Sequence, residues 1–337
     1  MKLRSRNTAL LTSLIPALIA AGCSGDSPSP SATGGALVAG GTQLTGGAAI
    51  TGGAQLTGGS QLTGGGQDAG GTQATGGGDA SMDNMMGSTF PSAAFGELDG
   101  SFTAKTITNT GPGNVYNIYH PAELGQDGVL HPVLTWGNGA TTTPDLYPLL
   151  PNLASHGFVV IAAQNSFVDG PMLKDGLDWM LEQNTVSGSP FEGKLDPDSV
   201  GALGYSLGSL ATFAIGTDPR LKTTVHISGG IMSGGDESQA ADITHPTAYF
   251  CDADETGPNC DSDFAVVTTT PTFYGTSSGV HVDYMLTATF YERFNAAVIA
   301  WLRWQLMHDD TMSMVFEGSS CTLCQDSNWT ILKKNMP

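Results

Sequence analysis

The sequence predicts an α/β domain in which a mainly parallel β-sheet is covered by helices on both faces. Apolar runs of strand length alternate with segments of helical period from about residue 91 onward. The run 158–163 (FVVIAA) is continuously apolar and 132–136 (PVLTW) is mostly apolar, as is typical of parallel strands buried on both faces. The region from 91 to 337, about 245 residues, is a usual size for one such domain.

The strands that we expect, in chain order, are 115–120, 132–136, 158–163, 199–204, 223–227, 247–250 and 272–274. Helices are expected at 149–156, around Leu173, Leu177, Met180 and Leu181, and from near Ser206. A last helix is expected over 287–307, with Phe290, Phe294, Val298 and Trp301 on its apolar face.

The first 22 residues have the pattern of a signal peptide. Lys2, Arg4 and Arg6 precede an apolar run at 9–21 that is too short to remain as a spanning helix. The run leads through small residues into Cys23, which resembles the lipobox of bacterial lipoproteins. We expect Cys23 to be lipidated, which places the protein outside the cytoplasm, anchored to the bacterial outer membrane or cell surface; the alternative is an ordinary cleaved signal with Cys23 incidental.

Residues 23–90 are predicted to form a flexible tether. Pairs of glycines recur every six residues from 34–35 to 76–77, with almost no aromatic residues between them. Such a segment buries too little apolar surface to offset its chain entropy, and it would reach roughly 40–50 Å. A hexapeptide solenoid is the alternative, although the repeats lack a regular bulky aliphatic residue.

The chain is strongly acidic. Its formal net charge of −19 becomes −22 once a leader with three basic residues is removed. This charge repels nucleic acids and anionic membrane surfaces. We therefore expect no nucleic-acid partner and contact with the membrane only through the lipid anchor. We also expect a monomer.

Four cysteines besides Cys23 predict two disulfides outside the cytoplasm. Proximity favours Cys251–Cys260 and Cys321–Cys324. The alternatives are a four-cysteine metal site, whose spacing is unusual, and a redox centre at 321–324, which lacks a thioredoxin-like context.

The motif 204–208 (GYSLG) is the strongest chemical signal. It is a G-x-S-x-G that directly follows an apolar strand, and glycines two residues on either side allow the sharp turn that exposes a serine nucleophile. Ser206 is thus the predicted nucleophile; the alternative is an ordinary glycine-rich turn.

A serine nucleophile needs a base and an orienting carboxylate, which in this type of fold follow in the order Ser, Asp, His. His281 lies in a loop just before the last helix and is the predicted base. Asp254, after the strand 247–250, is the predicted carboxylate, with Asp252 as the second choice. The acidic stretch could also be a solvated or cation-binding loop.

An oxyanion hole requires backbone N–H donors aimed at the developing charge. We expect one from Leu207, directly after the nucleophile, and one from Ala140 in the turn after the strand 132–136, with Asn138 as the alternative.

Several segments resemble bacterial polyester hydrolases of the cutinase and PET hydrolase group, within the α/β-hydrolase superfamily. They are 132–140 (PVLTWGNGA), 153–160 (LASHGFVV), 204–208 (GYSLG, against G-[WH]-S-M-G), 246–247 with 252–254, His281 and 295–302 (NAAVIAWL). Related dienelactone-hydrolase-like and chlorophyllase-like esterases share much of this pattern. The resemblance implies an α/β-hydrolase fold and hydrolysis of carboxylic esters, of lipid or polyester type, without a metal or organic cofactor.

Two departures bear on the substrate. The resembled enzymes have a tryptophan near 225–230, where this chain has Gly229 and Gly230, and an aromatic residue where it has Ala140. Both argue against efficient hydrolysis of aromatic polyesters. The alternative function is a catalytically inactive surface lipoprotein that binds polymer or cell-wall material.

Overall fold

A computed structural model describes residues 90–231, 235–254 and 257–336. The expected signal peptide, Cys23 and all of the expected tether except residue 90 lie outside the described residues. No helix in the described part of the chain has the length and apolar character needed to cross a membrane.

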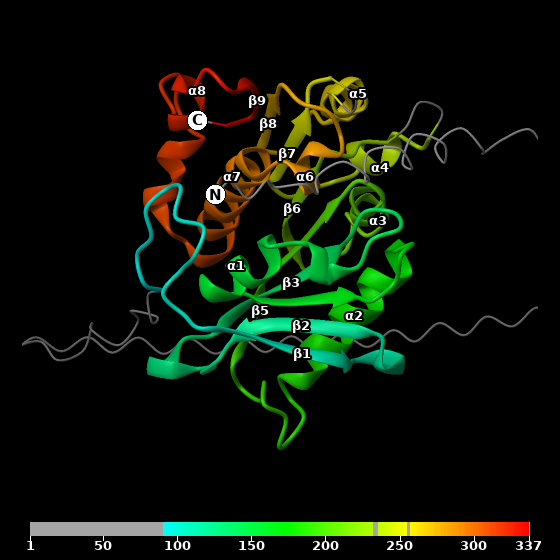
Figure 1. The fold of residues 1–337 in the computed structure, drawn as a ribbon, viewed down its shortest axis with the longest axis vertical. Coiled ribbons are helices and arrows are strands. Elements are labelled where there is room, and N and C mark those ends of the chain that lie inside the picture. The colour runs from blue at the N-terminus through cyan, green and yellow to red at the C-terminus, as the bar shows by residue number, and fades with distance from the viewer. Residues whose placement is uncertain (1–89, 232–234, 255–256, 337) are drawn as a thin grey trace, which may run out of the picture. The chain divides into compact units, whose positions relative to one another are not determined.

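One mixed sheet organises the described residues, with nine strands in the order β1-β2-β4-β3-β5-β6-β7-β8-β9 (Figure 1). The strands are β1 Ala104–Thr110, β2 Tyr116–Pro121, β3 His131–Gly137, β4 Val159–Ala163, β5 Leu195–Tyr205, β6 Leu221–Ile227, β7 Thr247–Asp252, β8 Thr272–Ser277 and β9 Thr330–Lys334. Neighbours from β4 to β8 pair in parallel, whereas β1 and β2 at one edge and β9 at the other pair antiparallel.

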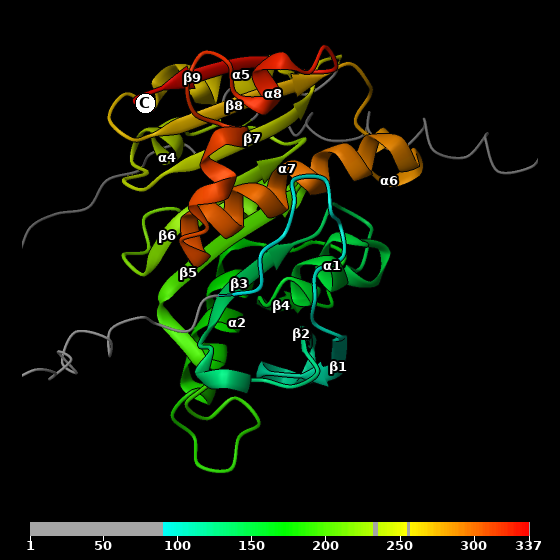
Figure 2. The same cartoon turned by 90° about the vertical axis from the view of Figure 1, so that its left-hand side faces the viewer.

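The α-helices of the described chain are α1 Leu149–Ser155, α2 Gly170–Gln183, α3 Leu207–Ala214, α4 Ser238–Ala241, α5 Gly257–Val266, α6 Asp283–Leu286, α7 Ala288–Met307 and α8 Thr322–Gln325. Short 3-10 helices are η1 Pro112–Asn114, η2 Gln126–Gly128, η3 Pro144–Leu146 and η4 Asp310–Val315. In Figure 2 the long helix α7 lies across the middle strands of the sheet.

Successive side chains of the central strands enter different cores because a strand points them to opposite faces. Val133 and Ala202 pack with α2 and α3, whereas Leu134 and Leu203 pack with α1 and α7. All of these side chains are buried. The predicted mainly parallel sheet with helices on both faces is therefore confirmed.

The expected central strands and the helices α1, α2, α3 and α7 are all present, with ends that differ by a few residues. The edge strands β1 and β9 were not predicted. Most residues of these strands are exposed or only half-buried, so they lack the apolar pattern that marks a buried strand.

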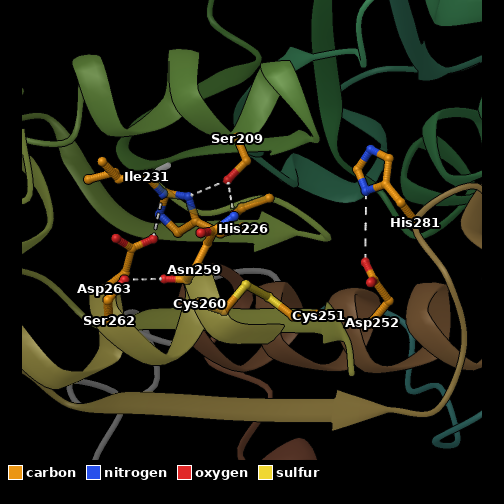
Figure 3. The surroundings of a disulfide bond; sticks show 11 residues. Ser209, His226, Ile231, Cys251, Asp252, Asn259, Cys260, Ser262, Asp263 and His281 are labelled. Carbon is orange, nitrogen blue, oxygen red and sulfur yellow. Dashed lines mark hydrogen bonds and ion pairs between the residues drawn. A yellow bond between two sulfur atoms is a disulfide. The ribbon is translucent and has the colours of Figure 1, made fainter. Parts of the chain in front are cut away.

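Both expected disulfides form, Cys251–Cys260 and Cys321–Cys324. Because all four sulfur atoms are paired, the alternative four-cysteine metal site is wrong. Cys251–Cys260 joins β7 to α5 (Figure 3), and it fixes the strand that ends at Asp252.

Candidate active site

Ser206 occupies a strained turn between β5 and α3. Its φ of 56° and ψ of −118° lie in a region that a residue with a side chain rarely adopts. The Ser206 N–H donates to the carbonyl of Ile227 at 3.0 Å, so β6 holds the turn in place. The predicted serine at a strand-to-helix elbow is present in the structure.

The two motif glycines are required by close packing. A Cβ on Gly204 would lie 2.2 Å from the carbonyl oxygen of Gly208. A Cβ on Gly208 would lie 1.9 Å from the carbonyl oxygen of Gly137, at the end of β3. Since these contacts are with backbone atoms that cannot move aside, only glycine fits at either position. The same contacts bring the end of β3 against the elbow.

His281 meets Ser206 as predicted, although 75 residues separate them. Its Nε2 lies 2.8 Å from Ser206 Oγ, a hydrogen-bond distance for proton transfer between nucleophile and base. The loop that carries His281 runs from β8 to α6. There the Asp283 carboxylate accepts a hydrogen bond from the Val280 N–H at 2.9 Å. Asp283 therefore stabilises this loop.

The structure places Asp252, rather than the predicted Asp254, beside His281. Asp252 is the last residue of β7 and is fully buried, with its Oδ2 3.8 Å from His281 Nδ1 (Figure 3). Asp254 is exposed, and its carboxylate accepts a hydrogen bond from the Gly279 N–H at 2.8 Å. The geometry therefore pairs His281 with Asp252, the second choice, and places the predicted Asp254 outside this contact.

Asp254 instead joins the two loops of the site. Its own N–H donates to the Gly279 carbonyl at 3.3 Å, while its carboxylate accepts from the Gly279 N–H. A further backbone bond runs from the Ala253 N–H to the Ser277 carbonyl at 2.9 Å. These contacts fix the distance between the strand ends that carry Asp252 and His281.

His226 is the other histidine near the elbow. It is fully buried, and its ring stacks 3.8 Å from Phe213 and 5.1 Å from Tyr249. Burial lowers the pKa of His226 to about 3, so the ring is neutral at physiological pH. Its Nδ1 lies 3.1 Å from Ser209 Oγ (Figure 3). The Ser209 hydroxyl in turn donates to the carbonyl of Gly229. His226 therefore supports the first turn of α3 from inside the core.

The turn after β3 keeps one predicted N–H available. The Gly139 N–H donates to the Tyr147 hydroxyl at 2.9 Å. The Asn138 side-chain amide donates to three carbonyls, those of Gly139, Thr142 and Asn165, which stiffens the turn. Ala140 is exposed, and its N–H donates to no acceptor among the described residues.

Leu207 supplies the other predicted donor. It is the first residue of α3, where a backbone N–H has no carbonyl one turn earlier to bind. Its N–H also points from the positive end of the helix dipole. Leu207 and Ala140 remain the predicted oxyanion donors.

The residues that follow β6 leave no room for a side chain next to the elbow. A Cβ on Gly229 would lie 2.7 Å from the carbonyl oxygen of Ser206 and equally close to the Cβ of Ser209. A Cβ on Gly230 would meet Asp263 Oδ2 at 2.7 Å. An aromatic side chain, which the resembled enzymes have near this position, would collide with these atoms at either glycine.

The strand order, the strained serine after β5 and the histidine after β8 define an α/β-hydrolase. The chain belongs to the PET hydrolase-like family (PETase), which it matches over residues 87–328. The resemblance seen in the sequence is therefore confirmed, and membership in this family supports hydrolysis of polyesters or other esters. No curated protein matches the chain.

Proposed function

We propose that the protein is a serine esterase that cleaves carboxylic esters through an acyl-enzyme intermediate. The observation that carries this proposal is the 2.8 Å contact between Ser206 Oγ and His281 Nε2 at a strained elbow. A serine hydroxyl is a weak nucleophile on its own, and an adjacent imidazole activates it.

In the acylation step, Ser206 Oγ attacks the ester carbonyl carbon while His281 Nε2 takes the hydroxyl proton. The buried carboxylate of Asp252 favours the tautomer with a proton on Nδ1 and stabilises the imidazolium. The N–H groups of Leu207 and Ala140 donate to the oxyanion. The imidazolium then protonates the departing alcohol.

Deacylation repeats the sequence with water. His281 takes a proton from the water, whose oxygen attacks the acyl carbon, and it returns the proton to Ser206 as the carboxylic acid leaves. In both steps His281 transfers the protons, Asp252 stabilises the imidazolium, and the backbone N–H groups stabilise the oxyanion.

The rim of the site favours an aliphatic acyl group over an aromatic one. At the elbow, Gly229 and Gly230 offer no ring on which an aromatic acid could stack, and Ala140 offers only a methyl group beside the oxyanion position. We therefore propose that aliphatic esters or aliphatic polyesters are better substrates than aromatic polyesters.

Covalent labelling by a fluorophosphonate tests whether Ser206 is a catalytic nucleophile. We expect the wild-type protein to be labelled covalently and Ser206→Ala to remain unlabelled. A p-nitrophenyl ester panel of increasing chain length, together with aliphatic and aromatic polyester films, then defines the substrate. No labelling and no turnover of the folded wild-type protein would identify the inactive polymer-binding lipoprotein instead. Faster release of product from the aromatic film would contradict the aliphatic preference.

The same proposal includes secretion and anchoring through Cys23. Supporting observations are the short apolar leader and the glycine-rich sequence after it. Metabolic labelling with a fatty acid should mark the wild-type protein and leave Cys23→Ser unlabelled. Equal labelling of both proteins would overturn the anchor.

A further inference from the structure

Tyr205 lies between Gly204 and Ser206 in the elbow motif and makes two contacts with His281. The Tyr205 ring stacks on the imidazole, with 5.1 Å between ring centroids and 14° between ring planes. The Tyr205 hydroxyl donates a hydrogen bond to the His281 carbonyl at 2.7 Å. One side chain thus contacts both the ring and the backbone of the predicted base.

Tyr205 is itself firmly held. It ends β5 and is only 2% exposed. Its ring centroid lies 4.8 Å from that of Tyr284 and 5.8 Å from that of Tyr147. A Cβ on Gly139 would lie 2.9 Å from the Tyr205 ring, so the glycine leaves the space that the ring occupies. The contacts to His281 therefore come from a rigid group.

The base, in contrast, lies in a loop. His281 stands between the end of β8 and the start of α6, and a quarter of its side chain is exposed. A loop with few buried contacts moves more than the sheet beside it. Proton transfer from Ser206 requires the imidazole to stay within hydrogen-bond reach, and a displacement of about 1 Å costs about 100-fold in rate.

We propose that Tyr205 is a positioning residue that keeps His281 in line with Ser206. This inference rests on the proposed serine esterase function. Tyr205 acts on the backbone and ring of the base, and neither contact is with an ester. Loss of its hydroxyl should therefore lower kcat and leave KM nearly unchanged.

The test compares Tyr205→Phe with Tyr284→Phe. Tyr284 is a matched control because it is buried in the same ring cluster, and its hydroxyl donates to Asn295 Oδ1 at 2.9 Å, on α7. Each variant loses a buried hydroxyl and the hydrogen bond that this hydroxyl donates. We expect kcat for a soluble ester to fall about 10-fold in Tyr205→Phe, the effect of one hydrogen bond, and to stay within about twofold in Tyr284→Phe. The rate of fluorophosphonate labelling should follow kcat.

A double variant separates positioning from a general loss of structure. In a His281→Ala background, Tyr205→Phe should not lower the residual rate further, because groups that act as a unit are not additive. Tyr205→Leu, which fits within the space of the ring and removes the phenol oxygen, provides a second variant if Tyr205→Phe does not fold. It should show the same kcat loss at unchanged KM.

Three results would overturn the inference: equal kcat in the two Phe variants, a change confined to KM, or additive losses in the His281→Ala background. In each case the wild-type protein would still be labelled and active, so the proposed function would stand. An unlabelled, inactive wild-type protein would reject the proposed function itself.

Discussion

Replacing Asp252 by asparagine should be the most damaging conservative change near the base. The substitution Asp252→Asn keeps the shape of the side chain and removes its charge. Two unit charges 3.8 Å apart attract by about 4 kcal/mol at an effective dielectric constant of about 20. Full burial of Asp252 protects this attraction from solvent screening. Loss of such stabilisation of the imidazolium corresponds to about a thousandfold fall in kcat.

Asp254→Asn is the matched control. It removes a charge two residues away, and the amide oxygen of the new side chain can still accept from the Gly279 N–H. Because Asp254 is exposed and its carboxylate is bonded to the loop rather than to His281, kcat should stay within about threefold of wild type.

The assay is the steady-state rate on a soluble p-nitrophenyl ester, with the melting temperature of each variant measured in parallel. A folded Asp252→Asn protein with near wild-type kcat would refute the assignment. So would a thousandfold loss in Asp254→Asn, which would restore the expectation from the sequence.

Three further predictions concern stability. Gly208→Ala should lower the free energy of unfolding by about 3 kcal/mol or more, measured by urea denaturation, because its Cβ would collide with the Gly137 carbonyl; an unchanged midpoint would contradict this. His226 stays neutral in the folded state, with a pKa of about 3, whereas the unfolded chain takes up a proton below about pH 6.5. The contribution of neutral His226 to the free energy of unfolding is therefore complete above pH 6.5 and is lost as pH falls towards 3. At pH 5 about 2 kcal/mol of it has been lost. The urea midpoint of His226→Gln should drop less between pH 7 and pH 5 than that of wild type, and equal drops would count against the buried neutral ring. Burial raises the pKa of Asp263 to about 7. The contribution of its protonated carboxyl to the free energy of unfolding is therefore complete below about pH 4 and lost as pH rises through 7. Asp263→Asn, which can still accept from the Ile231 N–H, should gain stability over wild type by roughly 3 kcal/mol more at pH 8 than at pH 5; a gain independent of pH would refute the shift.

The central sheet could be predicted from the sequence because its strands are buried on both faces and are mostly apolar. The elbow could be predicted because close packing against backbone requires both of its glycines. A Cβ at either Gly204 or Gly208 would collide with backbone, so the motif and its strained serine occur together. The position of His281 followed from the order of elements.

The carboxylate partner could not be chosen from the sequence. Asp252 and Asp254 differ by two positions at the end of β7, and their roles depend on where pairing with β8 stops. Asp252 is the last residue of the strand and pairs with Ser277, whereas Asp254 lies beyond the strand and bonds to Gly279. A strand end is not marked in the sequence to within two residues.

The contact between Tyr205 and His281 could not be predicted from the sequence either. The two residues are 76 positions apart, and only the assembled sheet brings them together. Tyr205 is apolar enough to be assigned to the core, and its hydroxyl gains a role only from the loop that folds over it.

The strand order determines when, during folding, activity can arise. Between β5, which presents Ser206, and β8, which precedes His281, the parallel strands β6 and β7 must both be inserted. Each parallel pairing closes a long loop, a slow event compared with forming a local hairpin. Recovery of ester hydrolysis after dilution from denaturant should thus lag behind recovery of helical circular dichroism, and a nascent polypeptide has no base until the ribosome has passed codon 281.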